Sequence, residues 1–428
     1  MIAKRIKSLK LWARVVYTPV EMFPKTETPP RLRRLPESVN CGGGVHLPET
    51  VTKQKQPPTP VVETFVHENP KLTFEECLDW FLVALRNMAN VRDFELHINT
   101  TGRPTYPNQM ERFLGYIWIA LKQKLQKLTF NGTLPDMVIF LRSKPPHINV
   151  VDINFTLYGL QSTRDAVQEK ILALVMPAYV KSLGPTFHSL TLRSWNSQDL
   201  TIPLMAFTAL PDLRLTSLEV TFTPGSVPSK SILKPFFSKV SLTLETLKFF
   251  YSIPGLDISP MNPEEVDIID SAFFSCLTNP ECFSNLRILE FYVIDLPKSV
   301  DLLPWFIKNS SKQLTKLTLT GPPLPISDVD RVLLALSVCS NLTHLHFGPL
   351  KFNSSLISSL AEKIPHLYSL ELDLVSDSNT LSLGPRQYKN WKLYNIFIRD
   401  RRTFMVREDL MKAVATRVLS LKSFEGTT

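Results

Sequence analysis

The chain has 428 residues, of which 44% are hydrophobic and 20% are charged, and its formal net charge at pH 7 is +9. Only 14 residues are glycine, about half the usual share, and the motifs G-x-x-x-x-G-K-S/T, G-x-G-x-x-G and G-x-S-x-G are absent. These absences exclude the common phosphate-binding, dinucleotide-binding and serine-hydrolase classes, so we expect a non-enzymatic protein without a cofactor.

Residues 1–16 allow two interpretations. In the stretch IKSLKL, Ile6, Leu9 and Leu11 occupy positions 1, 4 and 6 of an L-x-x-L-x-L motif that recurs along the chain, which predicts a first repeat strand. As a helix, the apolar residues of this stretch would share one face among basic residues, with no acidic residue before Glu21. That pattern resembles a mitochondrial targeting peptide. We favour the strand because it matches the later copies residue by residue.

A proline-rich stretch follows over residues 17–70. It holds ten of the 34 prolines and the run Gly42-Gly43-Gly44, with few periodic apolar positions. Such a composition buries too little apolar surface to offset the entropy lost on ordering. We therefore expect a disordered insertion that loops out of the first repeat.

From residue 71 onwards, helices and strands are predicted to alternate. Thr73 and Glu76 have the spacing of a capping box, and the helix that they begin precedes a strand over 91–96. A helix over 110–121 and a strand over 125–130 repeat the pattern. A weaker copy places Ile148, Val151 and Ile153 at motif positions 1, 4 and 6, and a helix over 163–180 comes next.

The motif is regular in the second half of the chain. Copies start 28 residues apart at Leu286, Leu314 and Leu342, and the longest step, of 42 residues, ends at Leu286. This spacing is typical of leucine-rich repeats. The copies start at Phe187, Leu215, Leu244, Leu286, Leu314, Leu342, Leu367 and Leu393.

Positions 4 and 6 of the motif share one face of a strand, while positions 3, 5 and 7 share the other. A single repeat cannot bury its apolar face alone, so the copies must stack. The sequence therefore predicts an α/β leucine-rich-repeat solenoid of about eleven irregular repeats, comprising the first strand and residues 71–428. The parallel sheet would form the concave face and the helices the convex face. A helix over 407–421 would cap the C-terminal end.

The order of these elements resembles that of a known family. The chain contains, in order, an opening strand, a long insertion, a helix with a Trp-Phe core and further strands. The matching stretches are IKSLKL (6–11), LDWFLVALRNMANVRDFEL (78–96) and YIWIALKQKLQKLTF (116–130). In this respect the chain is similar to the leucine-rich-repeat region of F-box proteins of mushroom-forming fungi. The resemblance implies the substrate-recognition part of an SCF-type ubiquitin ligase. A Skp1-type adaptor would bind only if an F-box lies upstream, because Leu35-Pro36-Glu37 is the only trace of one.

Stacked strands would place the side chains at positions 5 and 7 in two columns on the concave face. Glu219, Lys248 and Glu290 alternate in sign, as a self-neutralising ladder or a solvated surface would. Phe250 and Tyr292 would be adjacent aromatic anchors for a protein partner, unless the segment 253–285 covers them. The candidate partner-binding residues are Arg193, Glu219, Lys248, Phe250, Glu290, Tyr292, His346 and Glu371.

A metal-binding or hydrolytic protein on the same scaffold is the alternative function. His344 and His346 would share one face of a strand, with Glu371 beside His346, and such a group could hold zinc. Histidines in this arrangement are more often exposed to solvent or hydrogen-bonded to the neighbouring strand. We therefore predict no metal site.

Neither a nucleic acid nor a membrane is an expected partner. Much of the basic excess lies within the first 34 residues, and no apolar run has the length that spans a bilayer. The five cysteines include no C-x-x-C pair, which fits the cytoplasm or nucleus. Mitochondria are the alternative because of residues 1–16. Cys282 and Cys339 precede predicted strands and are expected to be buried.

Overall fold

The computed structural model describes most of the chain from residue 74 onwards and one short segment before it. The insertion expected over 17–70 and the capping residue Thr73 lie outside the described residues. Among the described residues, no helix has both the length and the apolar character that a membrane crossing requires. The described ranges are 7–12, 74–88, 90–98, 107–121, 125–143, 151–158, 166–183, 186–195, 197–251, 262–276, 279–292, 297–375, 387–400 and 405–423.

The described strands form one parallel sheet of twelve, and each strand pairs with the next in chain order. This confirms the predicted class of fold, an α/β solenoid whose strands and helices alternate. The strands are β1 (Ser8–Trp12), β2 (Asp93–His97), β3 (Lys127–Thr133), β4 (Asp152–Tyr158), β5 (Ser189–Trp195), β6 (Ser217–Phe222), β7 (Thr246–Tyr251), β8 (Ile288–Tyr292), β9 (Lys316–Thr320), β10 (His344–Phe347), β11 (Ser369–Leu374) and β12 (Asn395–Asp400).

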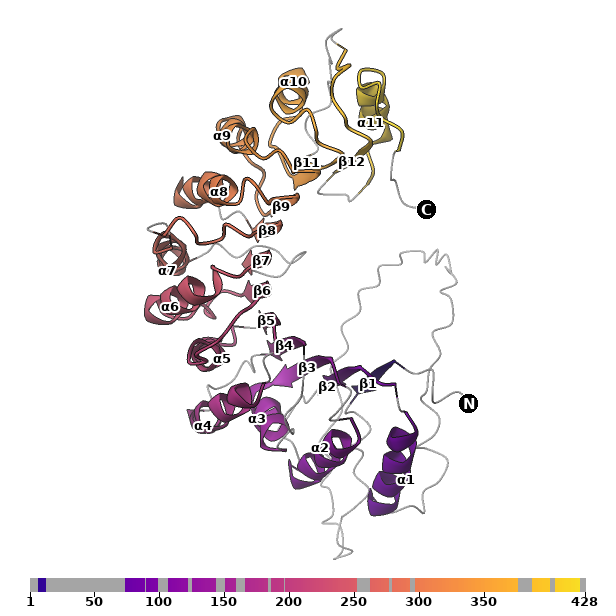
Figure 1. Ribbon diagram of the computed structural model, residues 1–428, viewed down its shortest axis with the longest axis vertical. Helices are drawn as coiled ribbons and strands as arrows, with labels where there is room; N and C mark the ends of the chain where they lie inside the picture. Colours follow the sequence, from indigo (N-terminus) through magenta and orange to yellow (C-terminus); the bar gives the residue numbers. More distant parts are fainter. Residues whose placement is uncertain are drawn as a thin grey trace, which may run out of the picture.

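The helices lie on the outside of an arc whose inside is lined by the strands (Figure 1). Successive helices pack side by side from α1 to α10, and α11 packs against β12. The helices are α1 (Phe74–Asn87), α2 (Pro107–Leu121), α3 (Leu134–Arg142), α4 (Ala166–Ser182), α5 (Thr201–Thr208), α6 (Lys230–Val240), α7 (Pro263–Phe274), α8 (Pro297–Asn309), α9 (Ile326–Leu336), α10 (Ser354–Lys363) and α11 (Glu408–Ala415).

The core lies between the sheet and the helices and is rich in aromatic rings at its centre. Phe249 of β7, Phe273 of α7, Phe291 of β8 and Phe306 of α8 are all fully buried. The ring of Phe273 lies 5.2 Å from that of Phe249 and 5.3 Å from that of Phe306, between ring centroids. Edge-to-face contacts of this kind add to the free energy of area burial. They join neighbouring repeats into one continuous core.

The cysteines of this core are free thiols. Cys282 and Cys339 are buried, as expected, and Cys276 is buried as well. Burial raises the pKa of the Cys339 thiol to about 12 and that of Cys276 to about 11. Since the thiolate is the reactive form of cysteine, both residues act as small apolar side chains.

The predicted register of the strand near residue 150 is wrong by two residues. Ile153 pairs with Leu128 of β3 and Leu190 of β5, so Ile153 takes motif position 4 and Phe155 takes position 6. A shift by two residues keeps every side chain on the same face, so the alternation could not distinguish the two registers. The observed register buries the larger ring of Phe155 completely and leaves Val151 partly exposed.

The C-terminal edge of the sheet is covered by more than the expected helix. Helix α11 is shorter than the predicted 407–421, and the chain returns to the sheet after it. Val406 forms an antiparallel bridge to Arg399, and Ser423 forms a parallel bridge to Asn395. Both halves of the outer edge of β12 therefore have backbone partners, which protects an edge strand from pairing with other chains.

Candidate functional site

The concave face consists of the strand residues that alternate with the buried ones. Along β5, β7, β11 and β12, partly exposed residues alternate with buried ones. The buried residues are those at the even motif positions 4, 6 and 8, such as Leu247, Phe249 and Tyr251 of β7. Positions 3, 5 and 7 therefore face the inside of the arc in Figure 1.

The strands stack in the register that the motif predicts, apart from the shift at β4. Leu247 of β7 pairs with Leu289 of β8, so the register holds across the longest step between copies. Position 5 forms an unbroken column on the concave face. Its members are Lys10, Glu95, Thr129, Asn154, Thr191, Glu219, Lys248, Glu290, Thr318, His346, Glu371 and Phe397.

Arg193 and Glu219, two of the candidate residues, form an ion pair between β5 and β6. Arg193 Nε donates to Glu219 Oε1 at 2.7 Å, and Arg193 Nη2 lies 2.6 Å from the same oxygen. The carboxylate of Glu219 is therefore neutralised by Arg193, which stands at position 7 of the preceding strand. The alternating ladder expected along position 5 would instead have set Glu219 against Lys248.

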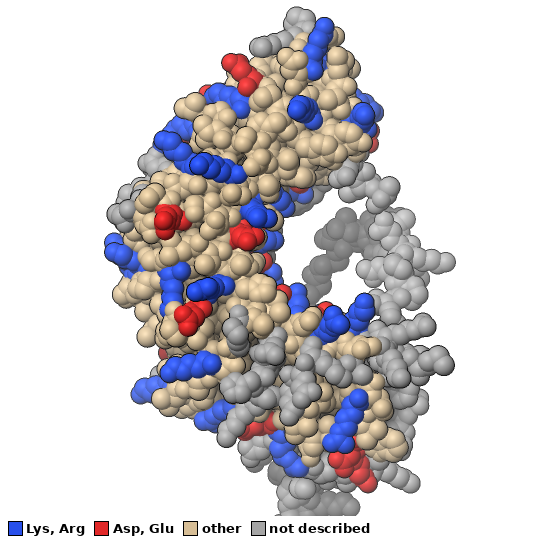
Figure 2. Space-filling view, in the orientation of Figure 1, with Lys and Arg blue, Asp and Glu red and all other residues tan. Residues whose placement is uncertain are grey.

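The next charged group joins three strands. Glu290 of β8 lies between Lys248 of β7 and Lys316 of β9, and each lysine Nζ is 3.2 Å from a different oxygen of its carboxylate. Sequence reasoning missed Lys316 because it stands at position 3, outside the two columns considered. Figure 2 shows basic and acidic side chains together along the inner rim of the arc.

Phe250 and Tyr292 lie at position 7 of the neighbouring strands β7 and β8. The residues that directly precede them, Phe249 and Phe291, are paired in the sheet. Both side chains are partly exposed, and Tyr292 also packs against the core. Part of the segment 253–285 forms α7, which packs between α6 and α8 on the convex side. Residues 253–261 and 277–278 of that segment lie outside the described residues.

Four side chains form a cluster at the C-terminal end of the concave face, here called the C-terminal cluster. His346 Nε2 lies 3.1 Å from Asp373 Oδ2, and His346 Nδ1 lies 3.8 Å from Glu371 Oε2. Arg399 of β12 donates to both oxygens of Asp373 and lies 3.4 Å from Glu371. Asp373 and Arg399 were not among the candidates, although both stand at position 7.

The histidine pair considered for zinc does not converge. His344 is exposed, and its Nδ1 is hydrogen-bonded to the hydroxyl of Thr343 at 2.8 Å. The possible ligand atoms of His346, Glu371 and Asp373 do lie within 4.8 Å of one another. However, the guanidinium of Arg399 already contacts both carboxylates, so a metal ion would have to displace a cation that is part of the fold.

The C-terminal cluster should make the free energy of unfolding depend on pH in the acidic range. Burial by itself raises the pKa of Asp373, but hydrogen bonds from His346 and Arg399 outweigh it and lower the pKa from 3.8 to about 2. Because the folded-state pKa is below the unfolded one, ionised Asp373 stabilises the fold above about pH 4, and this contribution disappears between about pH 4 and pH 2.

We therefore expect Asp373→Asn to be destabilising at neutral pH, and we expect the difference from wild type to shrink as the pH falls through this window. Urea titrations of both proteins at several pH values measure the difference. A difference in the free energy of unfolding that stays constant down to about pH 2 would contradict the assignment.

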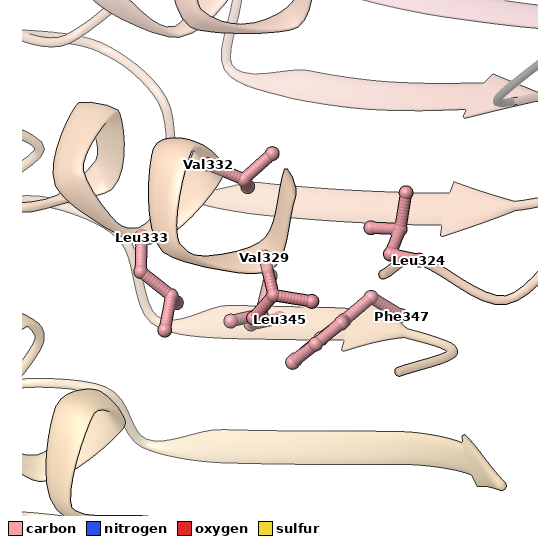
Figure 3. Close-up of a pocket in the computed structure, with 6 residues that line it drawn as sticks. All are labelled: Leu324, Val329, Val332, Leu333, Leu345 and Phe347. Carbon is pink, nitrogen blue, oxygen red and sulfur yellow. The ribbon is translucent and has the colours of Figure 1, made fainter. Parts of the chain in front are cut away.

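The described residues also enclose an apolar space between α9 and β10 (Figure 3). It leaves no room for a water-sized sphere, so it is a gap in core packing and offers no ligand site. It is lined by Leu324, Val329, Val332, Leu333, Leu345 and Phe347.

No protein-family model matches the sequence, and no curated protein matches it. The concave face of the sheet is therefore the basis of the functional proposal.

Proposed function

We propose that the protein is an interaction scaffold that recognises a protein partner on its concave strand face. The observation that carries this proposal is the partial exposure of Phe250 and Tyr292. Their neighbours Phe249 and Phe291 are fully buried. Aromatic side chains at the centre of a concave surface are the usual anchors of protein interfaces. The charged groups on either side would supply selectivity for the partner.

Recognition of substrates for an SCF-type ubiquitin ligase stays a prediction from the family resemblance. It requires that a Skp1-type adaptor co-purify with the full-length gene product. Recovery of that adaptor would support this more specific role, and its consistent absence beside other partners would contradict it.

Affinity purification with wild type and with Phe250→Ala/Tyr292→Ala tests the concave-face proposal. A suitable control is Trp80→Ala/Leu174→Ala, because these side chains are exposed on the convex helices α1 and α4. Loss of two anchors should weaken binding by at least about 2 kcal/mol, or roughly 30-fold in Kd. Partners should then be lost from the concave variant and retained by the control. Recovery of the same partners by both variants would contradict the proposal.

A further inference from the structure

The two lysines at the centre of the concave face share one carboxylate. Lys248 contacts one oxygen of Glu290 and Lys316 contacts the other, both at 3.2 Å. The Glu290 side chain is only 15% exposed, whereas those of Lys248 and Lys316 are 35% and 44% exposed. One positive charge is therefore left over, and each ammonium retains N–H donors for a further acceptor.

The groups on either side have no such positive excess. Arg193 and Glu219 neutralise each other, and in the C-terminal cluster two carboxylates face the single guanidinium of Arg399. Positions 3, 5 and 7 of β5 to β12 carry charged residues, histidine aside, only in these two groups and in the group of Lys248, Glu290 and Lys316. Among these strand residues, a positive excess exists only at Lys248 and Lys316.

Thr318 lies beside this cationic group with an unused hydroxyl. It pairs in register with Glu290 on one side and with His346 on the other. The residue is 8% exposed, and no described residue forms a hydrogen bond with its Oγ1. A buried hydroxyl without a partner costs about 1–3 kcal/mol. A bound ligand that supplied a carbonyl or carboxylate oxygen would remove that cost.

The aromatic pair adjoins the same group. Phe250 and Tyr292 follow Lys248 and Glu290 by two residues on their strands, so they share the same face at a distance of about 7 Å along the strand. A charged and an apolar side chain at this separation match residues i and i+2 of an extended peptide, whose side chains also lie on one face.

We propose that these residues bind an extended segment of the partner in which an Asp or Glu lies two residues from an aromatic or large aliphatic residue. The carboxylate binds between Lys248 and Lys316, the Thr318 hydroxyl donates a hydrogen bond to the segment, and the apolar side chain packs on Phe250 and Tyr292. This inference rests on the proposed function, because it specifies the partner of the same face.

A random dodecapeptide phage library, panned on the immobilised full chain, tests the inference. Recovered peptides are labelled, and their affinities are measured by fluorescence polarisation for wild type, Lys248→Glu/Lys316→Glu and the control Lys170→Glu/Lys234→Glu. The control makes the same change of charge on the convex helices α4 and α6. We expect peptides with the acidic and apolar residues two positions apart. Their affinity should fall at least about 30-fold in the concave variant and change less than about 3-fold in the control.

A second variant, Lys248→Gln/Lys316→Gln, guards against misfolding, because it removes both charges without setting three carboxylates side by side. It should also weaken the peptides. Enrichment of basic peptides, a selection without enriched peptides, or equal binding by wild type and the glutamine variant would overturn the inference. If the peptides ignore both lysines but still require Phe250 and Tyr292, this inference fails and the proposed function stands. If they bind equally to Phe250→Ala/Tyr292→Ala as well, the proposed function fails with it.

Discussion

Replacing Phe249 by alanine should lower the free energy of unfolding by about 3–5 kcal/mol, whereas the same change at Phe250 should lower it by less than about 1 kcal/mol. The two residues are neighbours on β7 but face opposite sides of the sheet. Phe249 is fully buried, with its ring centroid 5.2 Å from that of Phe273 and 5.4 Å from that of Phe291. Phe250 lies on the concave face, so its removal leaves no cavity in the core.

Denaturant titrations followed by circular dichroism compare the two variants. Since both changes remove the same side chain, the comparison isolates the effect of the environment. Equal losses of stability would mean that β7 does not alternate between a core face and a concave face.

Glu265→Ala should lower the free energy of unfolding by about 2–4 kcal/mol, a large effect for the loss of a single carboxylate. Glu265 of α7 is 8% exposed and accepts two hydrogen bonds of 2.8 Å, from the hydroxyl of Tyr251 and from the backbone N–H of Gly225. Alanine would leave both donors without this acceptor. The carboxylate thus ties α7 to the end of β7 and to the turn after β6.

The control is Glu264→Ala, because Glu264 is exposed in the first turn of the same helix. There a carboxylate contributes only through the helix dipole, about 0.3–1 kcal/mol. A double-mutant cycle with Tyr251→Phe should give a coupling energy above about 0.5 kcal/mol. Additive effects of Glu265→Ala and Tyr251→Phe would show that the hydrogen bond is not formed.

The sequence predicts the stacking of the repeats because the same apolar positions must be buried in every copy. Leu247 pairs with Leu289 despite the long intervening segment, since any shift by one residue would turn their side chains away from the core. A shift by two residues leaves the same side chains facing the core, so the apolar pattern does not exclude it. The alternation alone therefore could not place Ile153 at position 4 of its strand.

The ion pairs on the concave face could not be predicted from the columns of residues at motif positions 5 and 7. Long side chains reach diagonally, so Glu219 meets Arg193 from position 7 and Glu290 meets Lys316 from position 3. Such contacts depend on the rotamers of both partners, and the spacing of residues in the sequence does not encode them. The partial exposure of Phe250 also depends on its surroundings, because no periodic rule distinguishes an open position from a covered one.

The most direct test of the concave-face proposal is lysine cross-linking of the chain to a captured partner, with the linked residues mapped by mass spectrometry. The concave face carries Lys10, Lys127, Lys248 and Lys316, and the convex helices carry Lys170, Lys234, Lys308 and Lys363. We expect cross-links from the partner to the first set, with Lys248 and Lys316 prominent among them. Cross-links confined to the convex lysines would contradict recognition on the concave face.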